Sequence, residues 1–116
     1  MKVVYLAGPY RARGGRSVRE HVRMAEEWAV RLWSVGYVVF CPHLNSAFMD
    51  GEVPDERFLD GDLEIMRRMK PDVIGLLPGY GDSPGTRLEL AEADRLNIPH
   101  RTVQRLEAVG YETRRA

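Results

Sequence analysis

The residue whose type and position most suggest chemistry is Glu89, in the stretch LLPGYGDSPGTRLELAEA at residues 76–93. Residues 84–97 have the pattern of a helix with proline in its first turn, and the apolar side chains mark a buried arc. Glu89 falls inside this arc, where a carboxylate is costly unless it is paired, hydrogen-bonded or beside a cavity. The spacing therefore makes Glu89 a candidate catalytic carboxylate. The alternative is a partly exposed acid in the first turns, where the helix dipole favours negative charge.

The start of the same helix has the composition of a ligand site. Ser83 can cap the helix, and free backbone N–H groups at a helix start can bind an anion. Gly85 would let a ligand approach the backbone closely. Ser83, Gly85 and Thr86 are therefore candidate substrate-binding residues, with simple helix capping as the alternative.

A basic loop, PYRARGGR at residues 9–16, follows the first expected strand. The guanidinium groups of Arg11 and Arg13 suit phosphate, and Gly14 and Gly15 free the backbone beside them. The loop lacks both the G-x-G-x-x-G fingerprint of dinucleotide sites and the G-K-[ST] of a Walker A loop. It is therefore either an unusual phosphate-binding loop or a solvated basic one.

Four further side chains are candidates with ordinary alternatives. Asp62 lies in the acidic segment FLDGDLEIM, and acids are also common at helix starts. Tyr5 lies inside the first strand, where a core tyrosine is the default. His43 and Asn45 follow the second strand in CPHLNS, where polar surface is the default. The three histidines have no metal-ligand spacing with Cys41, so we expect no metal site.

Alternating elements must position these residues. Four runs rich in apolar and β-branched residues predict strands: KVVYLAG, YVVFCP, DVIGLLP and, more weakly, IPHRTV. Amphipathic spacing predicts helices at residues 17–36, 55–69 and 84–97, and Ser17 with Glu20 forms a capping box. Gly61 weakens the second helix, which could be two pieces. Residues 43–54 are interpreted as a long loop, and the tail at 104–116 receives no assignment.

This alternation predicts a single domain over residues 1–116. We expect a flavodoxin/Rossmann-like three-layer α/β/α fold, with a parallel sheet of four to five strands and right-handed crossovers. Ligands of such sheets bind beyond the carboxyl ends of the strands, at the topological switch point. The loops at residues 8–16, 42–54 and 78–85 should therefore meet at one site.

Composition narrows the partners. The formal net charge is zero, which gives no general attraction to nucleic acid polymers or anionic membranes. The single cysteine allows no disulfide framework within the chain and fits a reducing, cytoplasmic setting. The apolar run at the N-terminus is broken at Gly8-Pro9 and is too short to span a membrane. We therefore expect a cytoplasmic protein with no general affinity for nucleic acid polymers or membranes.

Three segments together resemble the nucleoside 2-deoxyribosyltransferase-like family, in particular its small phage and bacterial members. They are VVYLAGPYRARGGR, YVVFCPHLN and FLDGDLEIMRRMKPDVIGLLPGYGDSPGTRLELAEADRLNIP, which cover roughly residues 2–100. The most specific features are the Gly-Pro after the first strand, the Asp-Leu-Glu segment followed by Asp-Val-Ile, and the ending S-x-G-x-x-x-E. Members of this family cleave the N-glycosidic bond between a base and (deoxy)ribose.

The resemblance implies a role for each matching residue. Glu89 matches the nucleophile that attacks the anomeric carbon, and Tyr5 matches the tyrosine that orients it. Asp62 matches an aspartate that contacts the substrate and helps the base leave. Gly8, Pro9 and the rest of the 9–16 loop match the segment that wraps sugar and base.

One position separates the branches of the family. Transferases acting on nucleosides tend to carry an aspartate six residues before the nucleophile, and this chain has Ser83 there. This resembles the branch that hydrolyses deoxynucleoside 5′-monophosphates, where a serine and the helix start hold phosphate. Arg11, Arg13 and Gly14-Gly15 resemble the first loop of that branch. The 43–54 loop departs from the family pattern, and the chain is short.

The expected function is thus cleavage or transfer at the N-glycosidic bond of a (deoxy)nucleotide or nucleoside. The resemblance implies no cofactor and a homodimer or higher homo-oligomer, since some family members complete the active site with residues of a neighbour. The alternative is a non-catalytic nucleotide-binding module of the same fold. A flavodoxin-like signalling domain is disfavoured, because the first strand ends in Ala7-Gly8-Pro9 and not in an acidic phospho-acceptor cluster.

Overall fold

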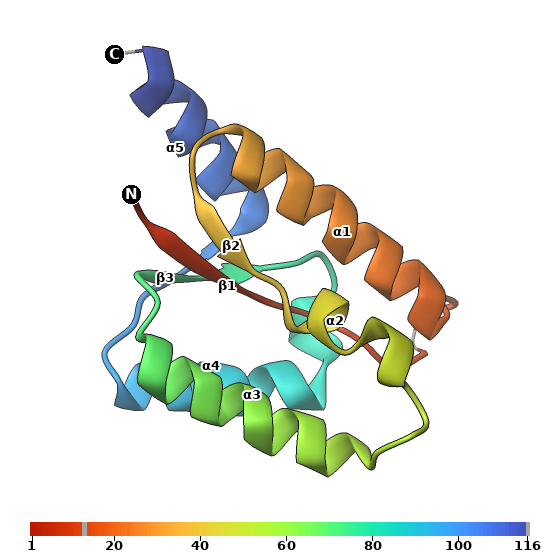
Figure 1. The fold of residues 1–116 in the computed structure, drawn as a ribbon. Helices are drawn as coiled ribbons and strands as arrows, with labels where there is room; N and C mark the ends of the chain where they lie inside the picture. The colour runs from red at the N-terminus through yellow and green to blue at the C-terminus, as the bar shows by residue number, and fades with distance from the viewer. Residues whose placement is uncertain (13, 116) are drawn as a thin grey trace.

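The computed structural model describes residues 1–12 and 14–115 and contains one four-stranded parallel sheet in the order β2-β1-β3-β4 (Figure 1). The strands are β1 (Val3–Ala7), β2 (Val38–Phe40), β3 (Val73–Leu76) and β4 (His100–Thr102). The helices are α1 (Val18–Ser34), α2 (Pro42–Asn45), α3 (Asp55–Met69), α4 (Pro84–Arg95) and α5 (Val103–Arg115), and two short 3-10 turns are η1 (Ala47–Met49) and η2 (Tyr80–Asp82).

Helices cover both faces of the sheet. Figure 1 shows α1 and α5 on one face and α3 and α4 on the other. The alternation of side chains along β1 divides the core accordingly: Val4 and Leu6 pack toward α1 and α5, whereas Tyr5 and Ala7 pack toward α3 and α4. The structure therefore has the predicted three-layer α/β/α fold with a parallel sheet of four strands.

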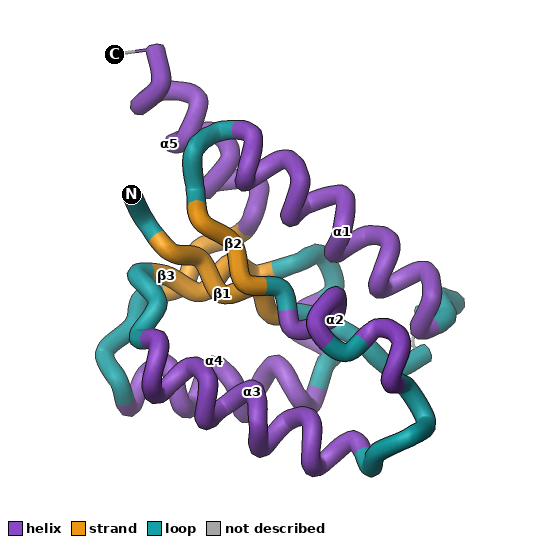
Figure 2. Tube along the Cα trace, viewed as in Figure 1, coloured by secondary structure: helices purple, strands orange, loops and turns teal. Residues whose placement is uncertain are grey.

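The topological switch point lies between β1 and β3. The chain passes from β1 to its neighbour β2 and then crosses to β3 on the other side of β1. Figure 2 shows the loops after β1, β2 and β3 on the same side of the sheet. Gly8 ends β1 here against Leu77, because a Cβ on Gly8 would lie 2.5 Å from the Leu77 Cβ. The close approach of the two strand ends thus requires glycine.

Most of the expected elements are present, with two differences. The capping box of Ser17 and Glu20 is confirmed, and α3 is one continuous helix that passes through Gly61 without a break. The interpretation of residues 43–54 as an unstructured loop was wrong, since α2 begins on Pro42, a residue suited to a first helical turn, and η1 follows. The tail without an assignment forms α5.

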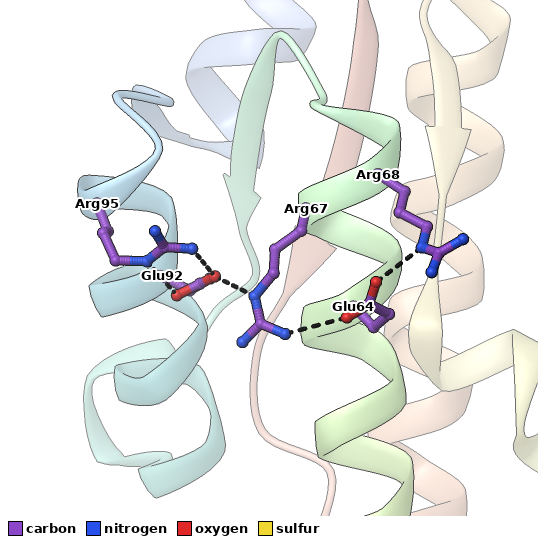
Figure 3. A network of polar contacts seen from close by, with 5 residues as sticks. All are labelled: Glu64, Arg67, Arg68, Glu92 and Arg95. Carbon is purple, nitrogen blue, oxygen red and sulfur yellow. Dashed lines mark hydrogen bonds and ion pairs between the residues drawn. The ribbon is translucent and has the colours of Figure 1, made fainter.

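Ion pairs connect α3 to α4, the two helices that carry the candidate acids. Glu92 of α4 accepts hydrogen bonds from Arg95 and from Arg67 of α3, and Arg67 and Arg68 also contact Glu64 (Figure 3). The arginines are exposed, so each pair contributes little alone. The network links the two helices at the surface. Among the described residues, no helix is long and apolar enough to cross a membrane.

Candidate active site

The carboxyl group of Glu89 is buried and hydrogen-bonded. Tyr5 Oη donates to Glu89 Oε2, with Tyr5 fully buried in β1 and Glu89 only 7% exposed on α4. The two residues are far apart in the sequence, and the sheet face under α4 brings them together. The prediction that Glu89 lies on the buried face of its helix is confirmed.

Burial sets the protonation of this pair and of the nearby Asp62. The pKa of Glu89 is raised to about 8, mainly by removal from water; the hydrogen bond from Tyr5 opposes this rise, and the charge of Asp62 adds to it. Burial also raises the pKa of Asp62 to about 6. The pKa of Tyr5 is raised as well, first by burial and then by Glu89, so its hydroxyl remains a donor at neutral pH.

A cavity of about 300 Å³ lies beyond the strand ends, beside Asp62. We call it the Asp62 cavity. All three predicted loops contribute to its wall, as does the first half of α3; residues used below are Tyr10, Arg11, His43, Asp62, Ser83 and Gly85. The expectation that these loops meet at one site is confirmed. Its volume is at the lower end of the range for small-molecule pockets.

Tyr5 and Glu89 lie behind the wall of this cavity and do not line it. Gly85 is on the wall, and Glu89 follows it by one helical turn on the same face of α4. A Cβ on Gly85 would meet no atom within 4 Å, so the space in front of this turn is open. Of the two candidate catalytic acids, Asp62 therefore lies on the wall and Glu89 lies beneath it.

His43 is buried rather than part of the polar surface. It is 5% exposed, and its Nε2 lies 2.8 Å from the Pro9 carbonyl oxygen, to which it donates a hydrogen bond. Burial lowers the pKa of His43, so the ring is neutral. Its Nδ1 is then an acceptor and has no partner among the described residues. Asn45, the other candidate of this segment, is exposed at the end of α2 and does not line the cavity.

The charge of Arg11 is already neutralised. Its guanidinium donates to Asp50 at 2.6 Å and to both carboxylate oxygens of Asp55, and it stacks on Tyr10 at 5.0 Å from the ring centroid. These contacts hold the first loop against the start of α3. An anion that binds Arg11 must compete with two carboxylates.

The start of α4 offers less to an anion than its sequence suggested. Ser83 is buried and accepts a hydrogen bond from the Thr86 N–H at 3.3 Å. Pro84 has no N–H, so Gly85 carries the remaining backbone donor of the first three helical positions. The buried Thr86 hydroxyl has no partner within the described part of the chain.

The glycines and Pro9 of the first loop have mainly conformational roles. Pro9 is buried and its carbonyl anchors His43. Gly14 and Gly15 adopt φ values of +56° and +78°, which favour glycine, and they are exposed. Neither lines the Asp62 cavity. Arg13, the other predicted phosphate ligand, lies outside the described residues.

Two features were not found by sequence reasoning. His21 of α1 is 2% exposed, and its Nδ1 donates to the Tyr10 carbonyl at 3.2 Å, so two buried histidines hold consecutive carbonyls of the first loop. The helical spacing of His21 with the buried residues of α1 could have revealed it. Burial also raises the pKa of Cys41 to about 11, so this thiol is protonated at neutral pH. Within the described residues, no cluster of three or more His, Cys, Asp or Glu could hold a metal ion.

The chain belongs to the family described as Domain of unknown function (DUF7768), whose model matches residues 2–103. This description assigns no activity. The comparison with curated proteins found no match to the chain.

Proposed function

We propose that the protein cleaves the N-glycosidic bond of a (deoxy)nucleotide or nucleoside, or transfers the sugar to another base, with Glu89 as nucleophile. The observation that carries this proposal is the buried Glu89 carboxyl group, oriented by Tyr5 and near Asp62, at the switch-point end of the sheet. Two acids of different environment are what glycosyl transfer requires, one to attack carbon and one to assist the leaving group.

The charge states of the two acids are consistent with this chemistry. At neutral pH the pair holds one proton, mostly on Glu89, because its pKa of about 8 exceeds the value of about 6 for Asp62. The reactive arrangement has this proton on Asp62 and is therefore the minor form of the resting protein. The positive charge that develops at the anomeric carbon stabilises the Glu89 carboxylate and so favours this arrangement.

The proposed reaction has two steps. In the first, Glu89 Oε forms a bond to C1′ while the C1′–N bond breaks, and the base leaves with the proton of Asp62. In the second, a water molecule attacks C1′, its proton passes to Asp62, and the Glu89 carboxylate is released. Attack by a second base in place of water gives transfer.

The test is release of free base. The protein is incubated with a panel of nucleosides and nucleotides, and the products are analysed by mass spectrometry. We expect release that is lost in Glu89→Ala and Glu89→Gln. The matched control is Glu92→Gln, which removes a carboxylate of the same helix that pairs with Arg67 and Arg95 and does not line the cavity. Release that persists in Glu89→Gln would refute Glu89 as the nucleophile.

A trapping experiment assigns the roles of the two acids. A 2′-fluoro-substituted nucleoside slows the second step, so the sugar stays on the nucleophile and peptide mass spectrometry identifies it. We expect the label on the peptide that contains Glu89. A label on Asp62, which is the acid on the cavity wall, would reverse the roles.

A second candidate function is a non-catalytic nucleotide-binding module. The observation that favours it is that Glu89 lies behind the cavity wall and is mostly protonated in the resting protein. A module of this kind binds nucleotides without releasing base, and its affinity is the same in Glu89→Gln, since glutamine mimics the protonated acid. Calorimetric titration of both proteins, run beside the release assay, separates the two functions.

A further inference from the structure

A second and larger cavity, of about 610 Å³, lies on the α1 side of the first loop. We call it the Arg16 cavity. Its wall comes from the start of α1, the first loop and the segment from Pro78 to Arg87; the residues used here are Arg16, His21, Asp82, Pro84 and Arg87. Pro84 also lines the Asp62 cavity, so the two cavities meet at the start of α4.

The two cavities carry opposite charge. On the wall of the Asp62 cavity, three carboxylates face a single arginine, Arg11, which is already paired with Asp50 and Asp55. On the wall of the Arg16 cavity, two arginines face one carboxylate, Asp82. An anionic group of a ligand is therefore repelled beside Asp62 and attracted on the other side of Pro84.

Both arginines of the Arg16 cavity retain their binding capacity. Arg16 Nη1 lies 3.8 Å from the Met24 sulfur, and Arg87 Nη2 donates to the Gly81 carbonyl at 3.1 Å. Neither guanidinium forms an ion pair with a carboxylate of the described residues. The pKa of the nearby Glu20 is lowered mainly by its hydrogen bonds with Ser17 and to a smaller extent by the charge of Arg16. Glu20 is engaged in the capping box of α1.

A buried histidine completes the wall. His21 is 2% exposed and lines the cavity, and because its Nδ1 is used on the Tyr10 carbonyl, Nε2 is the ring nitrogen that remains for a ligand. A neutral imidazole Nε2 accepts a hydrogen bond, and a protonated one donates to an anion. The wall thus combines two guanidinium forks, which match phosphate geometry, with one adjustable ring nitrogen.

The size of the Arg16 cavity leaves room for more than one phosphate group. Its volume of about 610 Å³ is roughly twice that of the Asp62 cavity, which lies at the lower end of the range for small-molecule pockets. We propose that the Arg16 cavity binds a phosphate chain of at least two groups, held by Arg16 and Arg87, while the attached nucleoside occupies the Asp62 cavity. The substrate class would then be nucleoside diphosphates and their esters. This inference rests on the proposed function for the nucleoside part and on the cavity alone for the phosphate part.

The first experiment tests the cavity without any nucleoside. Inorganic pyrophosphate is titrated calorimetrically into the wild-type protein and into Arg16→Gln, Arg87→Gln, Arg11→Gln and Arg95→Gln. We expect the first two variants to bind roughly 10- to 100-fold more weakly, because each loses a charge-assisted hydrogen bond. The matched control Arg95→Gln, on the exposed side of α4, should bind as the wild type does.

Three results would overturn the inference. The first is that the wild-type protein does not bind pyrophosphate, and the second is that only Arg11→Gln weakens its affinity. The third is that Arg95→Gln weakens the affinity as much as Arg16→Gln and Arg87→Gln do, which would indicate diffuse electrostatic attraction. All four substituted arginines have exposed side chains or lie at the surface, and circular dichroism establishes that each variant is folded.

The second experiment separates this inference from the proposed function. Glu89→Gln is titrated with a nucleoside, its 5′-monophosphate and its 5′-diphosphate, for the base found in the release assay or, failing that, for adenine and thymine. We expect the affinity to rise with the second phosphate, and the rise to vanish in Glu89→Gln/Arg87→Gln. Equal affinity for mono- and diphosphate overturns the inference even if base is released. If no base is released but the affinity still increases from nucleoside to monophosphate to diphosphate, the proposed function alone is refuted.

Discussion

Replacing Glu89 by glutamine should stabilise the folded protein, and the gain should grow with pH. Burial raises the pKa of this carboxyl group to about 8 from an ordinary value of 4.5. Between these two pH values the folded protein holds a proton that the unfolded chain has released. Its stability therefore falls as the pH rises, whereas glutamine carries no such proton and imitates the protonated acid.

The size of this stabilisation follows from the change in the pKa of Glu89. Each pKa unit corresponds to about 1.4 kcal/mol, so a shift from 4.5 to about 8 gives up to about 5 kcal/mol. The protonated form of Glu89 provides this stability in full below pH 4.5, and it is lost as the pH rises through 8. The stability of Glu89→Gln does not fall in this way. The free energy of unfolding of the variant should therefore exceed that of the wild type least at acidic pH and most above pH 8.

The assay is urea unfolding of both proteins at several pH values between about 5 and about 9, with linear extrapolation to water. Glu92→Gln is the matched control on the same helix. Hydrogen bonds from Arg95 and Arg67 lower the pKa of Glu92 to about 2, so it is ionised in folded and unfolded chains across this range. The effect of Glu92→Gln should therefore not change with pH.

Two outcomes would refute the reasoning. One is that the free energies of unfolding of Glu89→Gln and the wild type differ by the same amount at every pH, since the carboxyl group would then have the same pKa in the folded and unfolded chains. The other is a loss of stability that increases with pH, which would mean that the Glu89 carboxylate has a cationic or hydrogen-bonding partner that outweighs its burial.

Three other substitutions test single contacts. Tyr5→Phe removes the hydrogen bond that lowers the pKa of Glu89, so the fall of kcat/KM at alkaline pH, where the pair loses its one proton, should move to higher pH; an unchanged pH profile would argue against this bond. Gly8→Ala places a Cβ against Leu77 and should cost about 1–3 kcal/mol, measured as a lower thermal midpoint, and an unaltered midpoint would contradict the close contact. Arg67→Gln breaks exposed ion pairs between α3 and α4 and should lower the midpoint less than Gly8→Ala does; a larger fall would show that the network holds the fold.

The sequence predicted the sheet because its strands are continuous apolar runs, and it failed where the signal was weak. Helix α5 buries Val103, Leu106 and Gly110. Glycine counts against a helix in any propensity argument, yet a Cβ on Gly110 would lie 2.5 Å from a methyl carbon of Val35. The residue that weakened the helical pattern is thus the one that allows the helix to pack.

Contacts between distant residues limited the prediction of the site. Composition marked Arg11 as a phosphate ligand, but its actual partners are Asp50, from the segment interpreted as a loop, and Asp55, from the start of the next predicted helix. A pattern of residue types shows which charges are present and not which of them neutralise one another. The same holds for His43, whose burial depends on the short helix α2 and on the Pro9 carbonyl.

Glu89 shows what periodicity can and cannot give. Helical spacing alone predicted its burial, because the apolar residues of α4 define a face. Its partner Tyr5 is 84 positions away and was suggested only by resemblance to a family. The proton on Glu89 follows from neither source, since it depends on how completely the packed helices exclude water. A carboxyl group held there is costly, and a glutamine or an apolar residue would be more stable at neutral pH. The pH dependence of stability and of base release should therefore be measured on the same variants. If Glu89→Gln is more stable but releases no base, the destabilising carboxyl group is needed for catalysis.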